Sequence, residues 1–136
     1  MIRLPYLVLQ CFYTDQRGRL HRRQVSAFVG YLRRHSLRRM DCVIGHLADD
    51  GLQVAVKQVA NLPKEKPDEF LATCAVAIEA ARSTLAREQF GEWIALTRQL
   101  ADAIAGATPL TARLGMLLSG RRTPTVRLQL LDMLQA

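Results

Sequence analysis

Apolar and polar residues alternate with a helical period over most of the chain. Between residues 20 and 35 the apolar side chains form one stripe, Leu20, Val25, Phe28, Val29 and Leu32, which is the pattern of an amphipathic helix. Ser36 stands where a capping hydroxyl would begin a second helix, and apolar spacing then continues from Leu37 to Leu47. The turn signal Asp50-Gly51 follows. The sequence therefore predicts two consecutive helices, with a boundary at Ser36 and an end near Gly51.

Residues 52–57 fit two periods. Their apolar and polar side chains alternate as in a strand, yet Leu52, Val56, Val59 and Leu62 also recur at helical intervals. No second strand is apparent to pair with this segment, and a lone strand is unstable. We favour a helix here, and a short β element at 52–57 stays open as the alternative.

The second half begins after a polar segment with two prolines at residues 61–67, which is typical of a linker. Pro67 and the acidic Asp68 and Glu69 are first-turn residues, so they predict a helix with the core face Phe70, Cys74, Ile78, Ala81 and Leu85. A further helix would bury Phe90, Trp93, Leu96, Leu100 and Ile104. Gly91 is the candidate for the break between the two helices, and Gly106 for the end of the second.

Two Thr-Pro pairs each place a capping hydroxyl before a first-turn proline. Thr108-Pro109 predicts a helix with Leu110, Leu114 and Leu117, and Thr123-Pro124 predicts one with Val126, Leu130 and Leu134. The fold class is therefore all-α, a compact bundle of about six helices. We expect one domain over residues 1–136, which the linker could divide into an Arg-rich half (1–60) and an Ala/Leu-rich half (68–136). No longer internal repeat is visible.

Positive charge is concentrated at one end of the chain. The net charge is +7, and residues 1–40 hold nine arginines against one aspartate, whereas the remainder holds 10 basic and 11 acidic residues. Arginine offers a planar fork of donors that fits phosphate or carboxylate in two-point contact. The sequence thus predicts a phosphate-binding face at Arg17, Arg19, Arg22, Arg23, Arg33, Arg34, Arg38 and Arg39. Solvated helix faces are the alternative interpretation of these arginines.

The last third of the chain suggests a nucleic-acid partner on other grounds. A helical segment from Gln99 to Gly106, a turn, a short helix and the loop Ser119-Gly120-Arg121-Arg122-Thr123-Pro124 precede a final amphipathic helix. This order resembles phage-repressor-type helix-turn-helix domains, over residues 99–135 only. The resemblance implies that Thr108, Thr111 and Arg113 read base edges while Arg121 and Arg122 contact phosphates. Two ordinary Thr-Pro-capped core helices remain the alternative.

A winged-helix order is a weaker alternative for the first half. A helix over 5–14, then Gly18-Arg19-Leu20, two helices and the segment 50–54 follow that order. The wing would lack its returning strand, which counts against this interpretation.

Few residues suggest catalysis or metal binding. Of the three histidines and three cysteines only Cys42 and His46 share a helix face, which makes half a metal site at best. Asp49-Asp50 is the one candidate carboxylate pair, and its place before Gly51 favours a turn or capping role. No nucleophile signature or phosphate-cradling glycine loop is present. We therefore expect no enzyme, no metal and no cofactor.

The remaining composition suggests a cytoplasmic protein. An odd number of widely spaced cysteines, Cys11, Cys42 and Cys74, each with apolar neighbours, is typical of reduced thiols in a core. No apolar run approaches the length needed to span a bilayer, so no membrane role is expected.

The favoured function is that of a small basic nucleic-acid-binding protein, a regulator or accessory subunit with DNA or RNA as partner. The alternative is a helical interaction module, an adaptor, chaperone or complex subunit whose arginines meet an acidic protein. Homo-oligomerisation fits both, because the Ala-rich helix around residues 72–86 could pack against a copy of itself.

Overall fold

A computed structural model describes residues 4–15, 20–38, 43–58, 66–107 and 125–135 of the chain. Within these ranges every element is a helix and no strand is present, which confirms the all-α class. The helices are α1 (Leu4–Asp15), α2 (Arg22–Arg38), α3 (Val43–Gln58), α4 (Pro67–Thr84), α5 (Arg87–Gly106) and α7 (Thr125–Gln135).

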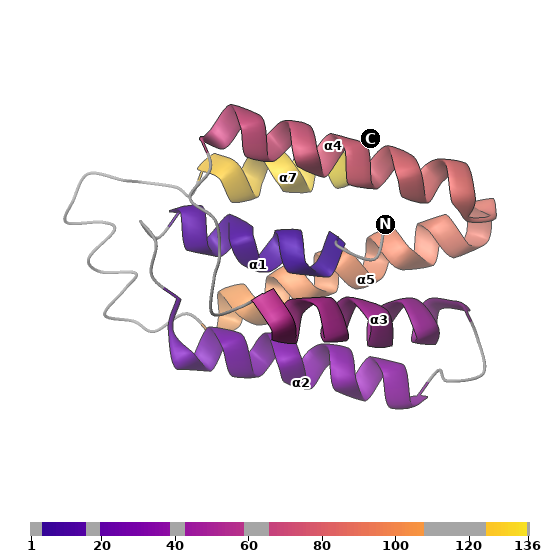
Figure 1. The fold of residues 1–136 in the computed structure, drawn as a ribbon, viewed down its shortest axis with the longest axis horizontal. Helices are drawn as coiled ribbons and strands as arrows, with labels where there is room; N and C mark the ends of the chain where they lie inside the picture. The colour runs from indigo at the N-terminus through magenta and orange to yellow at the C-terminus, as the bar shows by residue number, and fades with distance from the viewer. Residues whose placement is uncertain (1–3, 16–19, 39–42, 59–65, 108–124, 136) are drawn as a thin grey trace.

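The central helix of the bundle is α1 (Figure 1). Every residue of this helix from Leu4 to Phe12 is buried. A helix that is apolar all round has no face for water, so other helices must surround it. Accordingly α1 packs against α3 and also against α4, α5 and α7 from the second half of the chain. The buried side chains of both halves form one hydrophobic core.

Ser36 does not begin a helix, contrary to the prediction. α2 continues to Arg38, and the buried Ser36 hydroxyl donates a hydrogen bond of 3.0 Å to the carbonyl oxygen of Arg33. A serine hydroxyl bonded back to its own helix is compatible with a helix interior. Ser36 lies on the same buried side of α2 as Phe28 and Leu32. Packing of this side against the core stabilises the helix beyond Ser36. The next helix, α3, begins at Val43.

The Asp50-Gly51 pair, predicted as a helix end, lies inside α3. Gly51 is buried one turn away from Ala48 and Ala55, which are also buried. Glycine inside a helix costs roughly 1 kcal/mol relative to alanine. Ala48, Gly51 and Ala55 belong to the buried side of α3, which packs against α1, α2 and α5, and this packing offsets that cost. The turn or capping role predicted for Asp49 and Asp50 is therefore wrong.

Residues 52–57 belong to α3, so the favoured helical interpretation is confirmed and the alternative β element does not form. The wing of the winged-helix alternative falls on the same helix. That arrangement is excluded, because residues 50–54 are helical rather than extended.

The start of α4 is as predicted, with Pro67 in its first turn followed by Asp68 and Glu69. The break between α4 and α5 is not at Gly91. The chain becomes extended at Leu85 (φ −90°, ψ 148°), and Gly91 lies within α5 with open space where a Cβ would stand. As predicted, α5 ends at Gly106.

One capping arrangement occurs twice, which the sequence pattern did not reveal. The Gln24 side-chain oxygen accepts a hydrogen bond of 3.0 Å from the backbone N–H of His21 at the start of α2. Gln89 does the same for Ala86 at the start of α5, at 3.2 Å. Both glutamines stand in the pattern Leu-x-Arg-x-Gln, at residues 20–24 and 85–89. The side chain satisfies a donor that the start of a helix would otherwise leave without a partner.

The two caps differ in burial, so their removal should differ in cost. Gln24 is fully buried, whereas Gln89 is half-buried. We expect Gln24→Ala to lower the free energy of unfolding by about 1–3 kcal/mol, since the part-buried N–H of His21 loses its acceptor and a fully buried side chain is removed. Gln89→Ala should cost about 0.5–1 kcal/mol, as water can replace the lost acceptor. Urea unfolding followed by circular dichroism measures both, and the exposed Gln53→Ala on α3 is the control. Equal losses for Gln24→Ala and Gln89→Ala would contradict this account.

The last helix is held at its carboxyl end by α5. Leu130 and Leu134 of α7 are buried, as predicted. The Arg98 guanidinium of α5 donates a hydrogen bond of 3.3 Å to the carbonyl oxygen of Leu134. A cation at a helix carboxyl terminus satisfies a free carbonyl and interacts favourably with the helix dipole.

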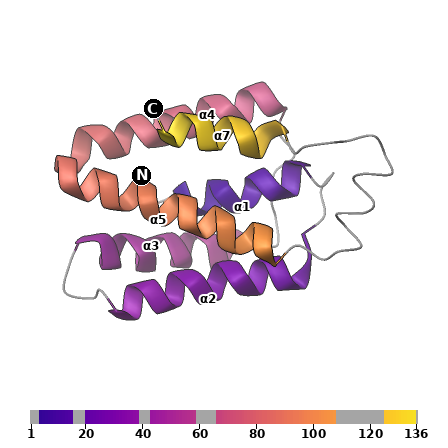
Figure 2. The ribbon, with the colours of Figure 1, turned by 180° about the vertical axis from the view of Figure 1, so that it is seen from behind.

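The arrangement places α2 and α4 at opposite edges of the bundle, as both views show (Figures 1 and 2). Seen from behind, α5 crosses between the α4/α7 pair and α2 (Figure 2), and it contacts all three. The outward surfaces of α2 and α4 are therefore separate from each other.

None of the described helices combines the length and the hydropathy that crossing a bilayer would require.

Candidate nucleic-acid interface

The outward face of α2 carries four described arginine side chains. Arg22 and Arg23 are in the first turn, and Arg33 and Arg34 follow eleven residues later; all four are exposed. Eleven residues are close to three full turns, so both pairs lie on one side of the helix. At 1.5 Å per residue the pairs are about 16 Å apart along the helix axis. The helix thus holds two pairs of guanidinium groups at opposite ends of one face.

Small residues separate the two pairs. Ser26 is exposed and Gly30 half-buried on the face between them, and a Cβ at Gly30 would meet nothing within 4 Å. The middle of the face is therefore low and open. A long anionic polymer could lie along it and reach both pairs.

The charges of these four arginines are not neutralised by the described part of the molecule. No described carboxylate forms an ion pair with any of them, whereas Arg82 of α4 does lie near Glu79, at 3.7 Å. The first turn of α2 contains no acidic residue. Arg22 and Arg23 therefore place positive charge at the positive end of the helix dipole, which is unfavourable in the absence of an anion.

The seam between α2 and α5 is closed by a tyrosine. The Tyr31 hydroxyl donates a hydrogen bond of 2.6 Å to the Gln99 side-chain oxygen, and the Tyr31 ring stacks on His35 with centroids 6.1 Å apart. Burial raises the pKa of Tyr31 above its ordinary value of 10.0; Arg34 lowers it and Asp102 raises it. The hydroxyl stays protonated at neutral pH and keeps its bond to α5. Tyr31 is thus a structural contact rather than a platform for stacking bases.

Negative charge lies on the neighbouring helix. The exposed residues of α5 include Glu88, Glu92 and Asp102. Of these three, Asp102 has an electrostatic effect on α2, where it raises the pKa of Tyr31, so it limits the positive surface on that side. A polyanion would be attracted along α2 and repelled from α5, which restricts how it can lie.

The structure brings together only part of the predicted set. Arg22, Arg23, Arg33 and Arg34 share one face, and Arg38 is the last residue of α2, where its backbone alone is described. The other predicted contacts lie outside the described residues: Arg17, Arg19, Arg39, Arg113, Arg121 and Arg122. The same holds for Thr108 and Thr111, so the supposed recognition helix of the helix-turn-helix resemblance stays a prediction.

Other candidate chemistry is not assembled in the described ranges. No group of three or more His, Cys, Asp or Glu side chains converges there. Cys42 lies outside these ranges, so its pairing with the exposed His46 stays untested. Cys11 and Cys74 are buried, and neither is part of a disulfide bond in the described ranges.

Comparison with known proteins adds no assignment: the chain matches no protein-family model, no curated protein and no solved structure. The function must therefore be inferred from the residues themselves.

The residues between the arginine pairs were not among the predicted site residues. Ser26 and Gly30 are not singled out by the apolar period, since they are polar or small. The signal was nevertheless present, because the Arg-Arg pairs repeat after eleven residues. Three helical turns place such pairs on one face, and Ser26, four residues after Arg22, and Gly30, four residues before Arg34, share it.

Proposed function

We propose that this protein binds nucleic acid through the outward face of α2, as a cytoplasmic regulator or accessory subunit without catalytic activity. One observation supports this proposal above the others. Four exposed arginines lie on one face, in two pairs about 16 Å apart, and no described carboxylate pairs with them.

The phosphate backbone of a nucleic acid suits such a face. Duplex DNA carries roughly one negative charge per 1.7 Å of its axis, so both arginine pairs meet phosphates at once. Arginine binds phosphate through two parallel hydrogen bonds, which is stronger than a single contact. Between the pairs Ser26 is the exposed side chain that could donate to a base edge. The face therefore favours binding that depends little on sequence, and its phosphate contacts alone do not distinguish DNA from RNA.

Affinity for a labelled duplex should fall steeply with salt. Four phosphate contacts predict a slope of about −3.6 for log affinity against log salt concentration. Between 50 and 200 mM salt the affinity should then drop on the order of 10²-fold. The double substitution Arg33→Glu/Arg34→Glu should weaken binding on the order of 10²-fold at low salt and make the slope shallower by about two. Fluorescence anisotropy with duplex DNA and with single-stranded RNA measures both quantities.

A matched control changes the same amount of charge elsewhere. Lys66→Glu/Arg87→Glu also replaces two exposed basic residues, at the starts of α4 and α5. Acidic residues are favourable at helix amino termini, so these substitutions should not unfold the protein. We expect the control to bind nearly as well as the wild type. No binding at low salt, or equal losses for the two double variants, would refute an interface on α2.

A helical interaction module is the second candidate, and one observation favours it. Val76 projects from α4 with 71% of its surface exposed, in the middle of an Ala-rich face. If this candidate is correct, affinity purification should recover a stoichiometric protein partner, and the protein should ignore nucleic acid. Recovery of nucleic acid without a protein partner would exclude this candidate.

A further inference from the structure

The exposed arginines of α2 form two rows along the helix. Consecutive residues of an α-helix are turned by about 100° around its axis, and eleven residues make about three turns. Arg33 is therefore in line with Arg22, which gives the first row, and Arg34 is in line with Arg23, which gives the second. The two rows are about 100° apart around the helix. Each row thus holds one guanidinium group near either end of α2.

Small residues lie between the two rows. Counted from Arg22, Ser26 is turned by about 40° and Gly30 by about 80°, so both fall between the rows. The Ser26 side chain is short, and a Cβ at Gly30 would meet nothing within 4 Å. The centre of the face is therefore a trough, formed by Ser26 and Gly30, with arginines on both sides of it.

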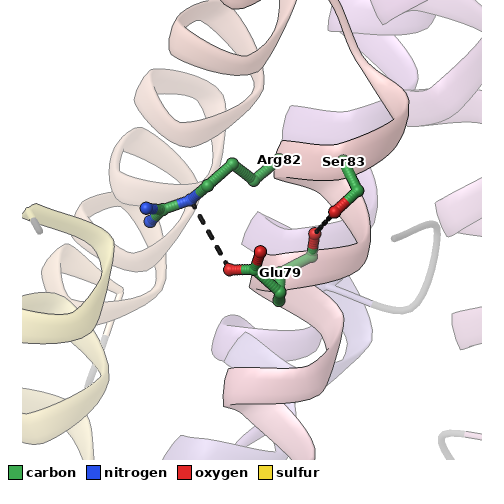
Figure 3. A network of polar contacts seen from close by, with 3 residues as sticks. All are labelled: Glu79, Arg82 and Ser83. Atoms are coloured by element: carbon green, nitrogen blue, oxygen red, sulfur yellow. Dashed lines mark hydrogen bonds and ion pairs between the residues drawn. The ribbon is translucent and has the colours of Figure 1, made fainter.

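The charges of the two rows differ from that of Arg82 on α4, which already has partners. The Arg82 guanidinium lies 3.7 Å from the Glu79 carboxylate (Figure 3) and 5.4 Å from the centre of the Phe90 ring. Among the residues that the structure describes, no carboxylate or aromatic ring holds an arginine of either row in this way. The rows can therefore bind an anion without first breaking such a contact.

Two rows of arginine fit two lines of phosphates better than one. A single strand that follows one row would meet two guanidinium groups and leave the other row in water. The walls of the major groove of B-form DNA belong to different strands, and the groove is about 12 Å wide. An α-helix with its side chains is about 10–12 Å across. In that groove α2 would turn one row toward each wall and the trough toward the base edges.

The position of α2 in the bundle permits this arrangement. α2 lies at an edge in both views (Figures 1 and 2), and the helices that it contacts, α3 and α5, are on its inward side. Its outward face can therefore enter a groove without a collision of those helices with the DNA.

An A-form RNA duplex offers no equivalent groove. Its major groove is deep and narrow, and its minor groove is wide and shallow. α2 could not turn both rows onto phosphate walls at once in either groove. The shape of the duplex therefore separates DNA from RNA where phosphate contacts alone do not.

We propose that α2 lies in the major groove of B-form duplex DNA, with one arginine row on the phosphates of each strand and the trough of Ser26 and Gly30 over the base edges. This inference rests on the proposed function, since it requires that α2 binds nucleic acid. It adds the class of nucleic acid and assigns each row to one strand. Because the trough offers few donors to the bases, the arrangement selects the form of the duplex rather than its sequence.

Three probes of one sequence test the class of nucleic acid: duplex DNA, single-stranded DNA and duplex RNA. In fluorescence anisotropy at low salt, duplex DNA should bind about 10- to 100-fold more tightly than either of the others. The slope of log affinity against log salt concentration should be about −3.6 for duplex DNA, from four contacts, and about −1.4 for single-stranded DNA, from two. Equal affinity for duplex DNA and either other probe would overturn this inference and leave the proposed function standing. No binding to any of the three would overturn both.

Substitution of one row at a time tests the assignment of rows to strands. Arg22→Gln/Arg33→Gln and Arg23→Gln/Arg34→Gln should weaken the binding of duplex DNA by similar factors, on the order of tenfold or more, and each should make the salt slope shallower by about two. Both rows matter equally because each contacts one strand. If only one of these double variants lost affinity, the phosphates would follow a single row, and the arrangement in the groove would be wrong.

Filling the trough tests insertion without any change of charge. Gly30→Leu places a bulky side chain between the rows, and leucine is a good helix former, so α2 should stay folded. Its affinity for duplex DNA should fall severalfold. Gly91→Leu on α5 is the matched control, since a Cβ there also meets nothing within 4 Å, and it should bind as the wild type does. Lys66→Gln/Arg87→Gln, with two exposed basic residues outside α2, controls for the row variants and should also bind normally.

Circular dichroism confirms that each variant is folded. An unchanged affinity of folded Gly30→Leu for duplex DNA would show that the face does not enter the groove. Losses in the control variants as large as those in α2 would likewise contradict the proposal.

Discussion

Replacing Trp93 by alanine should remove about 3–5 kcal/mol from the free energy of unfolding. The whole stability of a domain of this size is only about 5–15 kcal/mol. Trp93 is the chain's one tryptophan and is fully buried in α5. Its loss leaves a large cavity where α5 meets the core, and the surrounding helices can fill it only partly. Urea unfolding followed by far-ultraviolet circular dichroism measures the loss without needing the indole signal.

Phenylalanine at the same position should cost far less. The Trp93 indole Nε1 is buried, and no described residue accepts a hydrogen bond from it. Burying a donor without a partner costs about 1–3 kcal/mol, and Trp93→Phe removes this cost while keeping most of the ring. We expect a loss below about 1.5 kcal/mol. If Trp93→Phe lowered the free energy of unfolding as much as Trp93→Ala, this account of an indole N–H without a stabilising hydrogen bond would be wrong.

The second large effect is expected in α1. Leu9→Ala should lower the free energy of unfolding by about 2–5 kcal/mol. Leu9 is fully buried on the helix that contacts α3, α4, α5 and α7, so a cavity there weakens several helix contacts at once. The shift of the urea midpoint at constant slope measures this loss.

An exposed aliphatic residue provides the control for Leu9. Val56→Ala on α3 truncates a side chain that is 56% exposed, so it should change the free energy of unfolding by less than about 0.5 kcal/mol in either direction. Similar losses for Leu9→Ala and Val56→Ala would mean that α1 is not the centre of the core.

The core faces of α4 and α5 could be predicted because their patterns are local. Phe70, Cys74, Ile78 and Ala81 recur at helical spacing, and all four are buried in α4. Leu85 and Phe90, also predicted on the two core faces, are only partly buried. Pro67 with its acidic neighbours also marks the start of α4 by local chemistry alone. Nothing distant is needed to interpret such signals.

Helix boundaries failed where small or polar residues had two possible roles. Ser36 could cap a helix or bond back to its own helix, and Gly51 could end a helix or allow a close contact. In both places the residue is buried against other helices, so packing decides between the roles. Gly91 was wrongly predicted to separate two helices. It lies on the exposed side of α5, where no packing depends on it and a glycine inside the helix is tolerated.

The candidate interface shows the same division. Helical periodicity alone places Arg22, Arg23, Arg33 and Arg34 on one side of α2. Whether their charges are free could not be predicted, because a carboxylate from any other helix might have been packed against them. The arrangement of the bundle leaves α2 at an edge (Figure 1), and no described carboxylate forms an ion pair with its four exposed arginines.

The sequence by itself determined that this chain is helical, which faces of α4 and α5 are buried, and that its excess positive charge is near the amino terminus. These properties depend on residues within a few turns of each other. Only the tertiary structure decided that α1 is central, that α2 continues to Arg38 and α3 begins at Val43, and which outward faces remain uncovered. Those properties depend on contacts between residues far apart in the chain, and a helix that is apolar on every side gives no local indication of its neighbours.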